Sequence, residues 1–154
     1  MLTNLKLLTQ LQYEHDCKQC NPSYIPYVHK VVFTDKTANG LTKCVITWIK
    51  LHGYQAERIS TQGTYIQGKT VGTGFYGVKQ TKGKYIPGQG TKGSADISAT
   101  LKGGLSVKIE IKMKDRQSDA QKQYQSDIER AGGQYWLVRS MDDFIDKWNL
   151  IMNK

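Results

Sequence analysis

Residues 93–112 are Gly-Ser-Ala-Asp-Ile-Ser-Ala-Thr-Leu-Lys-Gly-Gly-Leu-Ser-Val-Lys-Ile-Glu-Ile-Lys, and their pattern predicts a β-hairpin at the centre of the fold. A strand-like run follows Asp96, and a Gly103-Gly104 turn separates it from a second run in which apolar and charged residues alternate. We expect the two runs to pair as β-strands, which brings Asp96 next to the second strand. Side chains two residues apart on a strand point to the same face, so Glu110 and Lys112 lie side by side.

Two interpretations of these charged residues are open at this point. Two carboxylates and an ammonium group on one sheet face can hold a divalent cation and activate a water molecule for hydrolysis. The alternation with Val107, Ile109 and Ile111 is also typical of an ordinary half-buried strand whose charged side chains are solvated. The sequence on either side of the stretch is therefore needed to decide whether these residues form a divalent-cation site or a solvated surface.

The composition indicates one soluble globular domain with a nucleic-acid partner. The chain has 154 residues, 38% of them hydrophobic and 23% charged. No apolar run approaches the ~20 residues that a membrane-spanning helix needs, and the N-terminus lacks the layout of a signal peptide. We expect a cytoplasmic protein without a membrane partner. The formal net charge of +9 favours a polyanionic partner, nucleic acid first.

The cysteines do not indicate a disulfide framework, because Cys17, Cys20 and Cys44 form an odd set. His15, Cys17, Cys20 and His29 can be written as a zinc site, although their spacing fits no common zinc pattern well. Free thiols in a reducing cytosol are the preferred interpretation. A zinc-dependent interaction protein is kept as a third functional alternative.

Helix and strand patterns alternate along the chain. Helical spacing of apolar residues covers residues 1–16, 41–52, 118–131 and the segment that begins at the capping box Ser140-x-x-Asp143. Gly53 and the pair Gly132-Gly133 stand where helices end. Strand patterns cover residues 54–60 and 134–140 in addition to the two runs above. The order predicts an α/β fold with a mixed sheet flanked by helices.

Residues 62–93 form a Gly/Lys-rich insertion with interleaved tyrosines, and no acidic residue occurs between Glu57 and Asp96. A groove or flap that tracks phosphates and a β-hairpin with solvated lysines are both compatible with this pattern. The candidate nucleic-acid-binding residues, here and after the second strand, are Arg58, Lys82, Lys84, Lys92, Lys114 and Arg116.

The motifs around the turn occur in an ordered series. Asp96 is followed by Glu110-Ile111-Lys112, then by a helix that opens with Ser118-x-x-Gln121 and closes with Ala131-Gly132-Gly133, and then by a strand. This order resembles the PD-(D/E)XK nuclease superfamily, and within it the stand-alone VRR-NUC nucleases of bacteriophages and prophages. The resemblance covers roughly residues 39–144.

The resemblance implies a restriction-endonuclease-like core, a mixed sheet flanked by helices in αβββαβ order, with the Gly/Lys-rich hairpin inserted. Residues 39–154 would form the VRR-NUC-like nuclease domain. Residues 1–38 would form an N-terminal extension packed on or next to this core, within a single domain overall.

The resemblance also implies a DNA nuclease that depends on Mg²⁺ or Mn²⁺, hydrolyses phosphodiester bonds in branched, flap or junction DNA, and acts as a homodimer in the bacterial cytoplasm. Asp96, Glu110 and the backbone carbonyl of Ile111 would ligate the metal. Lys112 would orient the attacking water and balance charge, because a lysine beside two carboxylates normally stays protonated.

Gln121 has two interpretations. The resemblance puts it near the active site, where it could touch the attacking water or a phosphate. As the third residue after Ser118, it could instead close a capping box at the helix N-terminus.

Two positions depart from the family pattern. Many relatives carry an additional glutamate on the first core helix, whereas residues 41–52 contain no carboxylate, and Glu57 on the next strand has the wrong spacing to replace it. Ala95 stands where a proline is expected before the motif aspartate. The absent carboxylate motivates an alternative function, a non-catalytic DNA-binding module on a nuclease scaffold.

Overall fold

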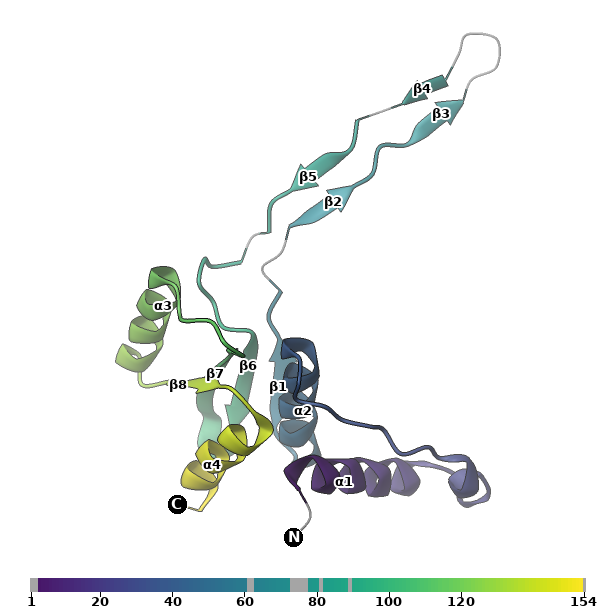
Figure 1. Ribbon diagram of the computed structural model, residues 1–154, viewed down its shortest axis with the longest axis vertical. Coiled ribbons are helices and arrows are strands. Elements are labelled where there is room, and N and C mark those ends of the chain that lie inside the picture. Colours follow the sequence, from purple (N-terminus) through teal and green to yellow (C-terminus); the bar gives the residue numbers. More distant parts are fainter. Residues whose placement is uncertain (1–2, 61–62, 73–77, 81, 89, 154) are drawn as a thin grey trace.

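The computed structural model describes residues 3–60, 63–72, 78–80, 82–88 and 90–153. A four-stranded sheet lies at its centre, helices cover both faces of the sheet, and two narrow ribbons project away from it (Figure 1). The predicted α/β class with a mixed sheet flanked by helices is confirmed. Among the described helices, none is long and apolar enough to cross a membrane.

The central sheet has the strand order β1-β6-β7-β8. Its strands are β1 (Gln55–Arg58), β6 (Ile97–Leu101), β7 (Leu105–Ile111) and β8 (Gln134–Val138). β6 pairs antiparallel with both β1 and β7, whereas β8 is parallel to β7. The pairing of β6 with β7 confirms the strand pair expected around Gly103-Gly104. Both glycines have positive φ angles, 72° and 78°, which an L side chain rarely adopts.

One face of the sheet forms the hydrophobic core with α2 (Ala38–Leu51) and α4 (Met141–Met152). Alternate strand residues such as Ile109 and Trp136 point to this face, as expected from the period of two along a strand. Phe144 of α4 packs on Trp136, with ring centroids 6.1 Å apart. The apolar residues of α2 and α4 are therefore buried against this face.

The other face of the sheet is covered by α3 (Asp119–Arg130). Tyr124 of this helix contacts Tyr135 of β8 edge to face, with ring centroids 6.3 Å apart. Ser118 and Gln121 form the predicted capping box at the start of α3. Gly132, with φ 84°, follows the end of the helix and allows the turn into β8. Charged residues of β7 on this face consequently lie beneath a helix.

The N-terminal segment packs into the same core. The helix α1 (Asn4–Gln19) begins and ends three residues later than the predicted 1–16, because Thr3 caps its start and polar residues continue it past its last leucine. A short 3₁₀ helix, η1 (Pro22–Tyr27), lies in the following segment. Leu8 and Phe33 are both buried in the core cluster. Residues 1–38 thus supply part of the core that supports the sheet.

The predicted Gly/Lys-rich insertion consists of two successive antiparallel ribbons between β1 and β6. The first pairs β2 (Thr64–Ile66) with β5 (Lys84–Ile86), and the second pairs β3 (Thr70–Gly72) with β4 (Val78–Gln80). Figure 1 shows both ribbons extending from one end of the sheet. The insertion therefore presents its side chains away from the core.

Candidate functional site

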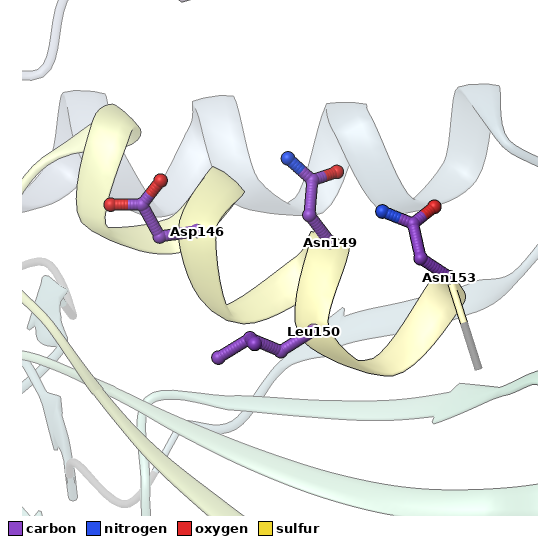
Figure 2. A pocket seen from close by; sticks show the side chains of 4 residues that line it. All are labelled: Asp146, Asn149, Leu150 and Asn153. Atoms are coloured by element: carbon purple, nitrogen blue, oxygen red, sulfur yellow. The ribbon is translucent and has the colours of Figure 1, made fainter.

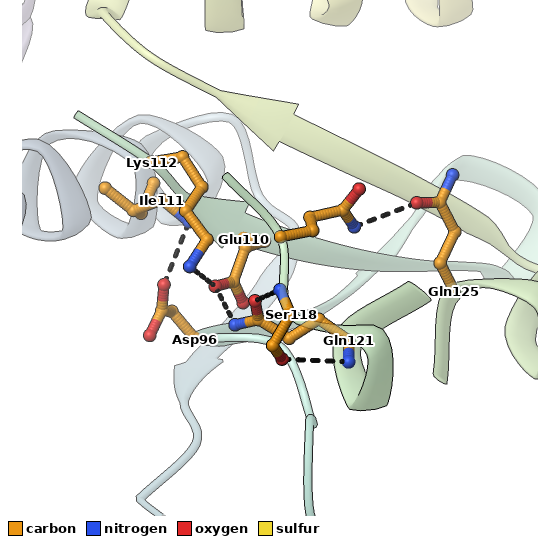
Figure 3. Close-up of polar contacts among 8 residues, drawn as sticks. Asp96, Glu110, Ile111, Lys112, Ser118, Gln121 and Gln125 are labelled. Carbon is orange, nitrogen blue, oxygen red and sulfur yellow. Dashed lines mark hydrogen bonds and ion pairs between the residues drawn. The ribbon is translucent and has the colours of Figure 1, made fainter. Parts of the chain in front are cut away.

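Asp96 and the end of β7 meet at one end of the sheet, as the strand pairing predicts. Oδ2 of Asp96 accepts a hydrogen bond from the backbone N–H of Ile111 at 2.9 Å. The backbone carbonyl of Asp96 accepts another from the N–H of Ile59 at 2.8 Å. Asp96 is therefore fixed by hydrogen bonds to β7 on one side and to the residue that follows β1 on the other. Its carboxylate lies close to Glu110 and Lys112 (Figure 3).

Glu110 is buried, so its side chain does not belong to a solvated strand face. Only 3% of the residue is exposed. Its Oε1 receives the Lys112 ammonium at 3.2 Å and a hydrogen bond from the Gln121 side-chain amide. Its Oε2 is buried and has no hydrogen-bond partner among the described residues. A buried carboxylate oxygen without a partner is costly, and a bound cation is one group that would satisfy it.

The environment of Glu110 raises the pKa of its carboxyl above the ordinary value for a glutamate. Burial is the largest cause because it disfavours the charged form, and the nearby negative charge of Asp96 adds to it. The Lys112 ammonium and the Gln121 amide act in the opposite direction, since both interact with the ionised carboxylate. Two carboxylates placed this close together in a partly buried site form a place where positive charge is favoured.

Gln121 forms the capping box that was one of its two interpretations, and it also contacts Glu110. Its Oε1 accepts the backbone N–H of Ser118 at 3.0 Å, and the Ser118 hydroxyl accepts the N–H of Gln121 at 3.3 Å, which closes the capping box. Its Nε2 donates to Oε1 of Glu110 (Figure 3). One amide side chain thus joins the N-terminus of α3 to the buried carboxylate.

The donor set at this end of the sheet fits a hard divalent cation. Asp96 and Glu110 supply carboxylate oxygens, and one of these, Oε2 of Glu110, lacks a partner among the described residues. The N–H of Ile111 points toward Asp96, and the carbonyl of a strand residue points to the same side as its N–H. The Ile111 carbonyl is therefore directed to the same region. Mg²⁺ prefers oxygen ligands and keeps several waters, so few protein ligands suffice.

A third carboxylate does not join this pair. Across the described part of the chain, no three His, Cys, Asp or Glu side chains are grouped closely enough to hold a metal ion. Glu57 is exposed on β1 opposite Ser98, which lies two residues beyond Asp96. It does not replace the glutamate that α2 lacks.

The alternative zinc site is not assembled either. His15, Cys17, Cys20 and His29 all lie within the described residues, and they do not form a group of three metal-binding side chains. Cys17 and Cys20 are half-buried free thiols near the end of α1, and Cys44 is a buried free thiol in α2. The structure thus does not support the zinc-dependent alternative.

A basic pocket of about 300 Å³ adjoins the carboxylate pair. Lys112, Arg116, Lys122 and Arg139 line it, together with a single acidic side chain, Asp115. Lys122 pairs with Asp119 at 3.0 Å, whereas the guanidinium groups of Arg116 and Arg139 have no acidic partner within the described part of the chain. Unpaired guanidinium groups in a pocket are suited to bind phosphate oxygens.

The predicted nucleic-acid-binding residues lie in different places. Arg116 lies in the basic pocket, and Lys114 is exposed on the same loop. Lys92 is exposed in the loop before β6, and Lys82 and Lys84 are exposed on the projecting ribbon.

Arg58 lies away from the pocket, at the end of β1. Its guanidinium donates to the side-chain oxygen of Asn39 on α2 at 2.9 Å. Of the six predicted basic residues, Arg116 therefore lines the pocket with Lys112, and the other five do not line it.

Sequence reasoning missed three residues near the carboxylates. Lys122 and Arg139 line the basic pocket, and both positions follow from elements that were predicted: Lys122 lies in the first turn of α3, and Arg139 directly follows β8. Tyr135 is buried on β8, and burial together with the negative charge of Glu110 raises the pKa of its phenol to about 12. A search for basic residues next to the ends of the predicted strands would have found Arg139.

A larger pocket of about 530 Å³ lies along α4 (Figure 2). Asp146, Asn149, Leu150 and Asn153 line it, and no candidate site residue is among them. Its described lining residues include no cationic group and no pair of carboxylates. The carboxylate pair and the basic pocket therefore lie elsewhere, where β6 begins and β7 ends.

Comparisons of the chain with protein-family models, with curated proteins and with solved structures found no match.

Proposed function

We propose that this protein is a Mg²⁺- or Mn²⁺-dependent DNA nuclease of the PD-(D/E)XK superfamily, related to the stand-alone VRR-NUC nucleases. The observation that carries the proposal is the state of Glu110. This carboxylate is almost completely buried, adjoins Asp96 and Lys112, and keeps one oxygen, Oε2, without a partner among the described residues. A carboxylate that served only stability would be paired on both oxygens or exposed to water.

The order of elements supports the same proposal. α2, β1, β6, β7, α3 and β8 follow one another in αβββαβ order, with the two ribbons inserted between the first and second strands. Asp96 precedes the second strand of this series, and Glu110 and Lys112 end the third. These are the positions in which the family resemblance expects its motif residues.

The chain's own residues have distinct roles in this proposal. Asp96, Glu110 and the Ile111 carbonyl would hold the cation, which when bound supplies Lewis acidity to water and phosphate oxygens. Lys112 and Gln121 both interact with Oε1 of Glu110, so they fix the carboxylate and leave Oε2 for the cation. The Lys112 ammonium also adds positive charge where a phosphate becomes more negative during hydrolysis.

The basic pocket beside the carboxylates supports a nucleic-acid substrate. The guanidinium groups of Arg116 and Arg139 would bind phosphates next to the one that is cleaved. The net charge of +9 favours approach of a polyanion. A preference for branched, flap or junction DNA, a homodimeric state and a phage- or prophage-encoded cytoplasmic protein follow from the family resemblance alone and are part of the proposal.

A cleavage assay tests this function. Purified protein is incubated with junction, flap, linear duplex and single-stranded DNA in Mg²⁺, in Mn²⁺ and in a chelator. We expect cleavage only with a divalent cation and strongest on branched DNA. Glu110→Gln, which keeps the shape of the side chain, is the matched control and should abolish cleavage. If all substrates stay intact with both metals, or if Glu110→Gln cleaves as well as the wild type, the proposal fails.

A second candidate function is a DNA-binding module without catalysis. The observation in its favour is the set of only two carboxylates, because the described residues contain no group of three metal-binding side chains. Under this alternative, the protein binds DNA with equal affinity in the presence and absence of divalent cations, and it cleaves none of the substrates.

A further inference from the structure

A sequence motif is repeated on the two strands of the β2–β5 ribbon. Gly63-Thr64-Tyr65-Ile66 is found on one strand, and Gly83-Lys84-Tyr85-Ile86 is found on the other. The strands are antiparallel, with Tyr65 directly opposite Tyr85. The two copies are therefore related by a local two-fold axis, and directly opposite side chains point to the same face of the ribbon.

Each tyrosine lies across the ribbon over the glycine of the other strand. A Cβ atom built on Gly83 would overlap the phenol end of Tyr65, and a Cβ atom on Gly63 would overlap the phenol end of Tyr85. Glycine at these two positions lets the rings pack directly against the opposite backbone. The tyrosines nevertheless remain 62% and 59% exposed. The backbone thus supports the rings from beneath, and solvent contacts them from above.

The β2–β5 ribbon exposes apolar side chains on both of its faces. Ile66 and Ile86 point to its other face and are 50% and 44% exposed, so large apolar side chains are accessible on both faces. A two-stranded ribbon with no core of its own is only marginally stable in water. Solvent-exposed aromatic and aliphatic groups on a projecting element are typical of a binding surface.

The positive charge of the insertion indicates what kind of molecule binds to the ribbon. Residues 58–95 contain six basic residues and no aspartate or glutamate. Lys84 is exposed opposite Ile66, on the face that the tyrosines do not occupy, and Lys82 is exposed just before β5. Contact with the same ribbon of a second copy would bring like charges together, whereas a polyanion complements them. Aromatic faces accept the bases of single strands, whose π-faces are free, but not those of an intact duplex.

We propose that the β2–β5 ribbon is a stacking platform for the unpaired bases of single-stranded DNA. Tyr65 and Tyr85 stack on bases, and the positive charge of Lys82 and Lys84 attracts the phosphate backbone of the strand. The choice of DNA rests on the proposed nuclease function, and the platform extends it by naming the part of the substrate that is recognised, a single-stranded segment such as a flap.

A binding assay in chelator tests the platform without cleavage. Fluorescence anisotropy is measured with a labelled oligothymidine of roughly 20 nucleotides, longer than the ~4–16 nucleotides that one binding module covers, and with a duplex of equal length. We expect the variant Tyr65→Leu/Tyr85→Leu to bind the single strand at least about tenfold more weakly, because stacking contributes at each base. Its affinity for the duplex should stay unchanged.

The variant Tyr65→Phe/Tyr85→Phe is the matched control, since it keeps both rings and should retain single-strand binding. A second measurement does not depend on the stability of the ribbon: photocrosslinking of wild-type protein to an oligonucleotide that contains 5-iodouracil should attach the base to Tyr65 or Tyr85. Crosslinks found only elsewhere, or equal single-strand affinity of the leucine variant, would overturn the proposal. A loss of self-association without a loss of single-strand binding would also overturn it.

The outcomes separate this proposal from the nuclease proposal. Glu110→Gln should bind the single strand as the wild type does, although it cleaves no DNA. If Glu110→Gln still cleaves while the leucine variant loses single-strand binding, the nuclease assignment fails and the platform stands. If cleavage depends on Glu110 while the leucine variant binds normally, the platform fails and the nuclease assignment stands.

Discussion

Gln121 donates its side-chain amide N–H to Oε1 of Glu110, and with its own Oε1 it accepts the backbone N–H of Ser118. The start of α3 and the buried carboxylate of β7 are therefore joined by one side chain. An amide is suited to this position because its two ends have opposite hydrogen-bonding character. Helix capping and the orientation of Glu110 consequently depend on the same residue.

The first prediction separates these two roles of Gln121. Ser118→Ala removes only the cap and should lower the free energy of unfolding by about 1 kcal/mol. Gln121→Ala should cost a similar amount, and in addition it should lower the cleavage rate, since Glu110 loses a hydrogen bond that holds its carboxylate. Chemical denaturation and cleavage kinetics measure both effects. Equal cleavage rates of the two variants would show that Gln121 acts only as a cap.

The second prediction concerns the pH dependence of stability. The pKa of Glu110 is raised in the folded protein by burial and by Asp96, so ionisation of this carboxyl costs the folded state more than the unfolded state. In chelator, Glu110→Gln should therefore be more stable than the wild type at neutral pH. The advantage should disappear below about pH 4, where the carboxyl is protonated in both states.

The wild type and Glu110→Gln also show whether the stability of the protein depends on a divalent cation. Added Mn²⁺ should raise the melting temperature of the wild type and leave that of Glu110→Gln unchanged, because a ligand that binds only the folded state stabilises it. A wild type that is more stable than Glu110→Gln in chelator at neutral pH would contradict the burial of an unsatisfied carboxylate.

The third prediction concerns the basic pocket. With the cleavage-deficient Glu110→Gln protein as background, Arg116→Ala and Arg139→Ala should each weaken binding of duplex DNA. Each should also lower the slope of log affinity against log salt by about 1, the value for one lost phosphate contact. Arg130→Ala is the matched control, because Arg130 lies at the far end of α3 and pairs with Asp127. A slope that changes equally in all three variants would argue against a specific phosphate pocket.

The fourth prediction compares two glycines with nearly the same backbone conformation. Gly53 and Gly93 have φ angles of 81° and 82°. A Cβ on Gly53 would meet no atom within 4 Å, whereas a Cβ on Gly93 would overlap the backbone of Ala120 and lie 2.8 Å from the nitrogen of Gln121. Gly53→Ala should cost about 1–2 kcal/mol of stability from left-handed strain alone.

Gly93→Ala should cost more than Gly53→Ala, because it also pushes the loop before Asp96 away from the start of α3. We further expect Gly93→Ala to reduce cleavage, whereas Gly53→Ala should not. Urea denaturation and cleavage kinetics of the two variants test this. Equal losses of stability would show that the loop can move without cost.

The strand pair, the helices and the proximity of Asp96 to Glu110 could be predicted because local patterns determine them. Apolar alternation, the Gly103-Gly104 turn and the Ser118 cap are each contained within a few residues. The end of α1 was placed three residues too early, since its last turn is polar and lacks the leucine spacing. Local sequence thus predicted where elements lie better than where they end.

The burial of Glu110 could not be predicted from its strand. Its alternation with apolar residues is the same as that of a solvated glutamate, and only the packing of α3 over this face buries it. Arg139 and Lys122 were missed for a related reason. They reach the pocket of Lys112 because β8 lies parallel to β7 and α3 begins at the same end of the sheet. Such tertiary relationships arise between segments that are distant in sequence.

Calorimetric titration with Mn²⁺ in the absence of DNA tests most directly whether Asp96 and Glu110 form a divalent-cation site. Wild type, Asp96→Asn and Glu110→Gln are measured side by side. We predict saturable binding by the wild type, a greatly weakened affinity for Asp96→Asn, and no saturable binding by Glu110→Gln. Absence of saturable binding by the wild type, or the same binding isotherm for Glu110→Gln, would contradict a divalent-cation site formed by Asp96 and Glu110.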